Sequence, residues 1–358
     1  MLKGKILFLT FIFLPFYYPM SYHIELTKMV FLFLFSFFMF ICLAQNKFNL
    51  IFNSYNKNDF LIFILLLTIV FLNVFMVGDN KALSNYIFLL AFFFCLIFFP
   101  LLFDIDVFND KYLITLLSYL IYVISFSIFT DYLILNFFGK EHQLLFNPLD
   151  KSYFSRPLGI FGQPSINSTL MVFYLSVLST RRKISLKLLI ISTTAILVQQ
   201  SGVGFVVFIL FLFFYFRNFF IFNYSKLIII FFLLLLFILL INYNFLEKLN
   251  SSYISSFFEQ FIHSIHKYWQ ESDLSIMKFL FGGVAHGVDF TLLFTIGSIG
   301  VVLTIFSLYF LFSYIKNIPS NHRFPIYILI AGTLHYPAAF YLINAFILPF
   351  ITRSLQNK

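Results

Sequence analysis

One arginine, Arg156, lies in the segment SRPLGIFGQP, ahead of two prolines and two glycines and close to the start of an apolar run. Pro157 and Pro164 restrict the backbone, while Gly159 and Gly162 permit tight turns. A guanidinium held on such a rigid turn can bind a phosphate or a carboxylate through two parallel hydrogen bonds. The segment therefore predicts an anion-binding site. The alternative is an arginine that anchors the adjoining helix to lipid headgroups.

A second candidate lies in SSFFEQFIHSIHKYWQES, which has helical periodicity near 256–271. One arc of that helix collects the apolar and aromatic residues, namely Phe257, Phe258, Phe261, Ile262, Ile265, Tyr268 and Trp269. The pattern predicts an amphipathic helix on the outer leaflet or across the top of a bundle. His266 and Lys267 then face water or a bound headgroup, and the alternative is a solvated face without chemistry. His263 and His266 have no third ligand at suitable spacing, so no metal site is predicted.

The third candidate is the glycine-rich segment FGGVAHGVDF, which leads into another apolar run. His286 and Asp289 lie at the entrance to that run, where a histidine or a carboxylate can act as general base for a hydroxyl. The alternatives are helix capping by Asp289 and simple solvation at the interface. His286 has no capping role in its turn and is the stronger candidate.

A membrane bundle has to position these segments. The chain has 358 residues, is 61% hydrophobic and 10% charged, and has a mean hydropathy of +0.96. Its apolar runs, mostly about 15 to 20 residues long, predict helices rather than barrel strands. The predicted fold is an all-α integral membrane protein with about 12 transmembrane helices, 11 being the alternative. The spans are 6–20, 29–44, 60–77, 82–103, 112–130, 165–180, 186–200, 202–216, 227–243, 290–315 and two short ones within 325–352, broken at His335–Pro337.

Charge predicts the orientation of these spans. With the N-terminus inside, 15 of the 23 basic residues but 4 of the 14 acidic ones fall on the cytoplasmic side. Both termini are then cytoplasmic, and the net charge of +9 reflects topology rather than nucleic acid binding. Residues 1–20 lack the small-residue cleavage site of a signal peptide and are expected to stay as the first span. Cys42 and Cys95 fall in predicted spans and are expected to be free thiols.

This topology gives a single polytopic domain, 1–358, with two long outer loops at 131–164 and 244–289, the second carrying the interfacial helix. Six of the seven histidines, all but His322, lie on the outer side of the membrane, so chemistry is predicted on the outer face. The spans contain no acid–base pair at mid-membrane, and the two halves show no internal repeat. Both observations argue against an ion-coupled transporter.

In the order of its motifs, the stretch 150–345 resembles the superfamily of O-antigen polymerases and O-antigen ligases of bacterial surface polysaccharide assembly. The resemblance begins with an Arg-Pro-x-Gly-x-Phe-x-x-Pro segment and continues through RRK, QQSG, the large outer loop and the paired glycines Gly297 and Gly300. The chain departs from that pattern at Ser165, where relatives usually carry asparagine. It departs again at His266 and Lys267, where many relatives have an arginine nearby.

The resemblance implies a metal-independent glycosyltransferase without cofactors, using an undecaprenyl diphosphate-linked oligosaccharide as donor. Arg156 is then the catalytic residue that neutralises the diphosphate, and His286 or, after it, Asp289 is the general base. The substrate-binding residues that this scheme implies are Tyr153, Gln163, His266, Lys267, Lys278, Trp269 and His335, with His335 also a third candidate base. For the aromatic residues the alternative is an interfacial belt.

The expected function is a repeat-unit polymerase for O-antigen or capsule at the outer face of the bacterial cytoplasmic membrane. An O-antigen ligase is the alternative with similar chemistry, and a polysaccharide flippase or a secondary transporter is the non-enzymatic alternative. Besides the lipid-linked donor and membrane lipid, the candidate partners are a chain-length regulator and a flippase.

Overall fold

The chain was analysed in a computed structural model that describes the following residues. They are 12, 68, 110–139, 142–143, 156–182, 184–219, 259, 262–263, 265–266, 276–282, 291–316, 318–335, 338 and 342–356. Within these ranges every regular element is a helix, and there is no strand. The predicted spans at 6–20, 29–44, 60–77, 82–103 and 227–243 lie outside the described residues, as do Cys42 and Cys95.

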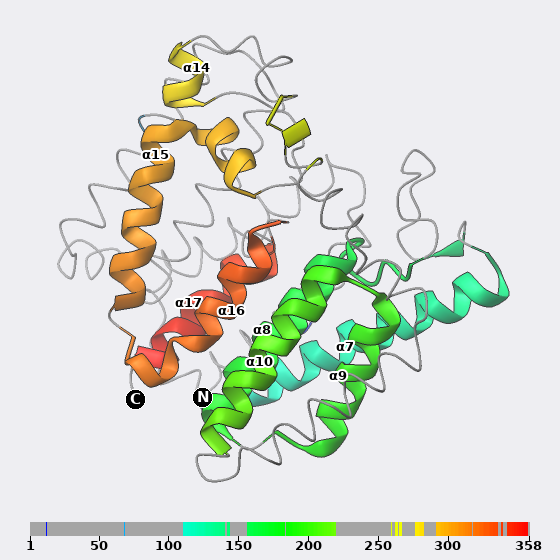
Figure 1. Ribbon diagram of the computed structural model, residues 1–358. Coiled ribbons are helices and arrows are strands. Elements are labelled where there is room, and N and C mark those ends of the chain that lie inside the picture. Colours follow the sequence, from blue (N-terminus) through cyan, green and yellow to red (C-terminus); the bar gives the residue numbers. More distant parts are fainter. Residues whose placement is uncertain are drawn as a thin grey trace, which may run out of the picture.

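Apart from α14, which lies in the predicted outer loop 244–289, the described α-helices occur where apolar runs predict them (Figure 1). They are α7 (Asp110–Phe137), α8 (Pro164–Arg181), α9 (Leu186–Gln199), α10 (Gly202–Phe219), α14 (Ile276–Phe281), α15 (Thr291–Lys316), α16 (Phe324–Thr333) and α17 (Leu342–Gln356), with a 3-10 turn, η4 (Ser320–His322). The tail is divided into α16 and α17 across the His335–Pro337 region. The bounds agree closely with the predicted spans except in α7, which continues to Phe137 rather than ending at 130.

Local sequence explains where the central helices begin. Pro164 stands at the start of α8, where a missing N–H costs nothing and the fixed φ favours the helix. Ser185 caps α9 by accepting a hydrogen bond from the Leu188 N–H at 3.3 Å. Ser201 does the same for α10, with its Oγ 3.1 Å from the Gly204 nitrogen. The short QQSG segment thus separates α9 and α10 through its own capping residue.

One described helix, 111–137 within α7, is both long and apolar enough to cross a membrane. Shorter apolar helices lie at 186–199, 202–216, 299–309 and 324–333. The inner face of α7 has the three- and four-residue spacing of a packed helix. Its buried apolar residues are Leu113, Leu116, Leu117, Leu120, Ile121, Ile124 and Ile128. Large apolar side chains such as Phe126 and Leu133 are exposed on other faces of the same helix.

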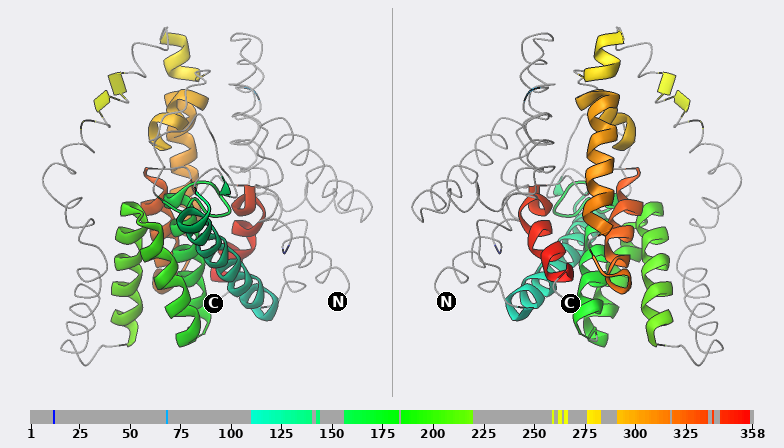
Figure 2. Two further views of the ribbon diagram at one scale, coloured as in Figure 1. Left: turned by 90° about the vertical axis from the view of Figure 1, so that its right-hand side faces the viewer. Right: turned by 90° about the vertical axis from the view of Figure 1, so that its left-hand side faces the viewer.

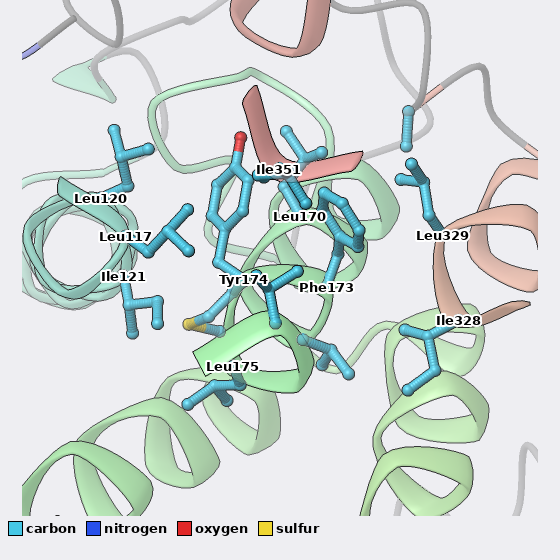
Figure 3. Packing of buried hydrophobic residues seen from close by; sticks show 14 of the residues in the cluster. Leu117, Leu120, Ile121, Leu170, Phe173, Tyr174, Leu175, Ile328, Leu329 and Ile351 are labelled. Atoms are coloured by element: carbon cyan, nitrogen blue, oxygen red, sulfur yellow. The ribbon is translucent and has the colours of Figure 1, made fainter. Parts of the chain in front are cut away.

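Helix α8 is the centre of the described bundle and contacts α7, α9, α10 and α16. Figure 2 shows α8 among these neighbours from two further sides. Every residue from Ile166 to Leu178 is buried, polar ones included. Figure 3 shows how α7, α16 and α17 supply side chains to the core around Tyr174 and Phe173. The labelled residues of that core are Leu117, Leu120, Ile121, Leu170, Phe173, Tyr174, Leu175, Ile328, Leu329 and Ile351.

Polar contacts inside this core join distant parts of the chain. The Tyr174 hydroxyl lies 3.1 Å from Asn344 Oδ1, and Asn344 Nδ2 donates to the Ala338 carbonyl at 2.8 Å. Ser168 Oγ donates to Gln199 Oε1 at 2.7 Å, which ties α8 to the end of α9. Buried hydrogen bonds of this kind satisfy groups that would otherwise be costly to bury, and so they fix the helices against one another.

Small residues let α10 and α16 approach α8 very closely. A methyl group at Gly204 would lie 2.2 Å from Ser168 Cβ, and one at Gly332 would lie 2.2 Å from Thr169 Cγ2. Such distances are far below van der Waals contact, so both glycines are required by packing.

We expect Gly204→Ala to lower the free energy of unfolding by about 1–3 kcal/mol, because the added methyl group forces α10 away from α8. Thermal unfolding of the detergent-solubilised protein measures this loss. Ser168→Gly removes the opposing Cβ but also the hydrogen bond to Gln199, so it is destabilising alone and should cost less in the Gly204→Ala protein than in the native one. Single and double variants together form a cycle whose coupling energy should be about 0.5–3 kcal/mol. Strictly additive losses would contradict the close contact.

Helix α15 is interrupted at Gly300, which has φ 77° and ψ 166°. This conformation is almost restricted to glycine. The end of α14 lies against the break, since a methyl group at Gly300 would come 2.2 Å from the Leu280 carbonyl oxygen and 2.6 Å from the Gly282 nitrogen. Figure 1 shows the change of direction in α15 beneath α14. The predicted continuous span at 290–315 is therefore two helical pieces joined at a glycine.

Candidate functional site

The residues from Arg156 to Gln163, which we call the Arg156 loop, form a compact turn that leads into α8. Gly159 and Gly162 have positive φ values of 67° and 66°, and the Gly162 N–H donates to the Gly159 carbonyl at 3.0 Å. Residues 157–161 are buried. The glycines thus give the tight turns that their positions in the sequence predict.

Three consecutive N–H groups of this loop are bound by side chains from α7 and α8. The Gly159 N–H donates to Asp131 Oδ2 at 2.7 Å, and the Ile160 N–H donates to Ser127 Oγ at 3.0 Å. The Phe161 N–H donates to Asn167 Oδ1 at 3.3 Å. Because buried backbone donors are costly unless paired, these contacts hold the loop in one conformation.

Asn167 also binds the carbonyl groups of the loop. Its Nδ2 donates to the Leu158 carbonyl at 2.7 Å and to the Gln163 carbonyl at 2.8 Å. The Asn167 side chain is fully buried, and a methyl group at Gly159 would lie 3.1 Å from its amide. One side chain on the first turns of α8 therefore joins the loop to the helix that follows it.

Arg156 stands at the beginning of this fixed segment and is partly buried. Its carbonyl accepts a hydrogen bond from Gln143 Nε2 at 3.1 Å. Its guanidinium makes no hydrogen bond or ion pair with any described residue. In contrast, Arg182 donates to Ser118 Oγ at 2.8 Å, and Arg323 donates to two backbone carbonyls. The backbone of Arg156 is thus anchored, and within the described part of the chain its guanidinium has no partner.

The other described candidates lie in four different segments of the chain. Gln163 ends the Arg156 loop, and its carbonyl accepts from the N–H groups of Ile166 and Asn167, both at 3.1 Å. Lys278 lies in α14, which packs on α15 and stands apart from the start of α8 in Figures 1 and 2. His266 is helical and exposed, while His335 follows α16 and is partly buried. Gln163 is the described candidate that shares a loop with Arg156, and the end of α16 that precedes His335 contacts α8 through Gly332 and Thr169.

The remaining candidates lie outside the described residues. These are the two predicted bases and three of the predicted ligand contacts, namely His286, Asp289, Lys267, Tyr153 and Trp269. Of the predicted interfacial helix, the described residues Glu259, Ile262, His263, Ile265 and His266 are all helical. No group of three metal-ligating side chains is found among the residues that the structure describes.

Sequence reasoning missed the residues that hold the loop, Asp131, Ser127 and Asn167. Asp131 follows the predicted span at 112–130 and was assigned to the start of the outer loop, whereas it is helical and fully buried. One signal was present, because Ser127 and Asp131 are four residues apart and share a face of any helix that includes both. Comparisons with protein-family models, curated proteins and solved structures find no match for this chain.

Proposed function

We propose that the protein is a membrane glycosyltransferase that polymerises oligosaccharide repeat units carried on undecaprenyl diphosphate. In this proposal about 12 helices cross the bacterial cytoplasmic membrane, both termini are cytoplasmic, and the Arg156 loop faces outward. The observation that carries the proposal is a largely buried loop whose N–H groups at 159–161 are all hydrogen-bonded, and whose Arg156 guanidinium makes no hydrogen bond or ion pair with the described residues at the start of α8. A diphosphate headgroup is the ligand that such a fixed cation suits.

The chemistry needs two contributions from the protein. As the bond between the anomeric carbon of the donor sugar and its diphosphate oxygen breaks, negative charge grows on the diphosphate. Arg156 stabilises that charge because its position is fixed before the reaction. A base takes the proton of the acceptor hydroxyl as the hydroxyl oxygen attacks the anomeric carbon, and the products are a lengthened glycan and undecaprenyl diphosphate. His286 is the proposed base, followed by Asp289 and His335.

One observation favours a second candidate, a carrier of lipid-linked glycans. Interrupted helices are typical of transporters, and α15 is interrupted at Gly300. An O-antigen ligase shares the proposed chemistry and differs in its acceptor.

Deletion of the gene in its native host tests the proposal and separates the three functions. If the protein is the polymerase, lipid-linked single repeats accumulate on the outer face, and the surface glycan loses its ladder of chain lengths on a gel. A flippase defect instead leaves the repeats on the cytoplasmic face, where an added membrane-impermeant enzyme cannot reach them. A ligase defect leaves long polymer that is still attached to undecaprenyl diphosphate. Either of the last two results would reject the polymerase.

A further inference from the structure

We propose that Asp131 is a positioning residue whose buried carboxylate fixes the Arg156 loop and so sets the direction of the Arg156 guanidinium. This inference rests on the proposed function. Asp131 is on α7, near its C-terminal end, and is fully buried. Its Oδ2 accepts the Gly159 N–H at 2.7 Å, a well-formed hydrogen bond for an N–H donor.

The position of this acid has a cost that calls for a functional explanation. A carboxylate withdrawn from water is unfavourable unless its hydrogen bonds compensate the lost hydration. Acidic groups inside an apolar helix are rare for the same reason and are typical of functional sites. The loop is held by Asp131 and Ser127 from α7 and by Asn167 from α8, so it joins both helices. Asp131 is the acidic member of this set.

The contact at Gly159 can reach Arg156 because the chain between them has little freedom. Pro157 has a fixed φ, both Pro157 and Leu158 are buried, and the Leu158 carbonyl is bound by Asn167. A further consequence concerns the ligand: the N–H groups of residues 159–161 are already bound by the protein and are not free to bind a phosphate. Recognition of the diphosphate then depends on the Arg156 side chain rather than on the loop backbone.

Two substitutions at one position separate geometry from charge. Asp131→Asn keeps an oxygen that can accept the Gly159 N–H, whereas Asp131→Ala removes the acceptor. Hydrogen–deuterium exchange of the loop in the purified full-length protein measures the contact without any assay of activity. In Asp131→Ala we expect exchange at Gly159 to become about tenfold faster, and in Asp131→Asn to stay within about threefold of the native rate.

The kinetic arm uses the native lipid-linked repeat unit as substrate. Because a small misplacement of a catalytic group costs up to about 10²-fold in rate, Asp131→Ala should lower kcat about 10- to 100-fold with little change in KM. Asp131→Asn should retain most of the native kcat. In an Arg156→Ala background, Asp131→Ala should add no further loss, because a residue that acts through Arg156 has nothing left to position.

Ser127→Ala is the milder second variant and decides the matter if Asp131→Ala does not fold. It removes the acceptor of the Ile160 N–H, and exchange at Ile160 should rise with a smaller fall in kcat. Unchanged loop exchange in the alanine variants overturns the inference, as does an Asp131→Asn enzyme as slow as Asp131→Ala. Full polymer formation by Arg156→Ala is a separate result. It rejects the proposed function, while the exchange experiment still reports whether Asp131 holds the loop.

Discussion

Arg156→Ala is expected to abolish full-length polymer and to lower the rate of glycan transfer about 10²- to 10³-fold, the usual effect of removing one pre-positioned charge donor. The loss should fall mainly on kcat, because the charge on the diphosphate is greatest when the sugar leaves. The protein should fold normally, since the Arg156 guanidinium makes no hydrogen bond with the described residues and its backbone contact to Gln143 remains. Transfer of radiolabelled repeat units by the purified enzyme measures the rate.

Arg156→Lys keeps the positive charge but loses the planar pair of donors, so an intermediate rate, about tenfold below the native one, is expected. Arg182→Ala is the matched control, because it removes a guanidinium whose described partner, Ser118 Oγ, belongs to α7 rather than to the Arg156 loop. Its polymer should have the native ladder. If Arg156→Ala made the same ladder, the guanidinium would have no part in the reaction.

Gly300→Ala is expected to lower the free energy of unfolding by about 2–5 kcal/mol, for two independent reasons. An alanine cannot adopt φ 77° and ψ 166° without strain, and its methyl group would overlap the Leu280 carbonyl oxygen. That neighbour is backbone, so no change of rotamer relieves the contact. The expected result is a large fall in the thermal midpoint of the detergent-solubilised protein, measured by size-exclusion chromatography after heating.

Ile305→Ala provides the control in the same helix, because Ile305 is 60% exposed and its loss leaves no cavity in the core. It should unfold within a few degrees of the native protein. A Gly300→Ala protein as stable as this control would show that α15 can run through position 300 without a break.

The positions of the described helices could be predicted because the signals are local. Pro164, the RRK turn and the QQSG segment interrupt apolar runs at points that the chain itself specifies. Helices α8 and α9 begin and end at these points, and α10 begins at the last of them. The break in α15 has no such signal, because glycine occurs in continuous and interrupted helices alike. The contact made at the break is with the carbonyl of Leu280, which belongs to another helix and cannot be read from the sequence around Gly300.

The candidate site likewise has one part that the sequence predicts and one part that it does not. A rigid turn around Gly159 and Gly162 follows from proline and glycine spacing, and both residues have the positive φ that tight turns use. The hydrogen bond from the Gly159 N–H to Asp131 cannot be predicted from this spacing, since the two residues are 28 positions apart in sequence. An acidic residue directly after an apolar run is predicted to begin a loop as long as its hydrogen-bond partner is unknown.

Under the proposed function, the enclosure of α8 restricts how the lipid-linked substrate approaches. Side chains of the neighbouring helices cover this helix from Ile166 to Leu178, so a polyisoprenoid tail has no surface on it to follow. The exposed apolar stripe of α10 at Val206, Leu210 and Phe213 offers such a surface. In the proposed reaction the hydrocarbon tail would stay against this exposed face of α10. The diphosphate headgroup alone would extend to Arg156.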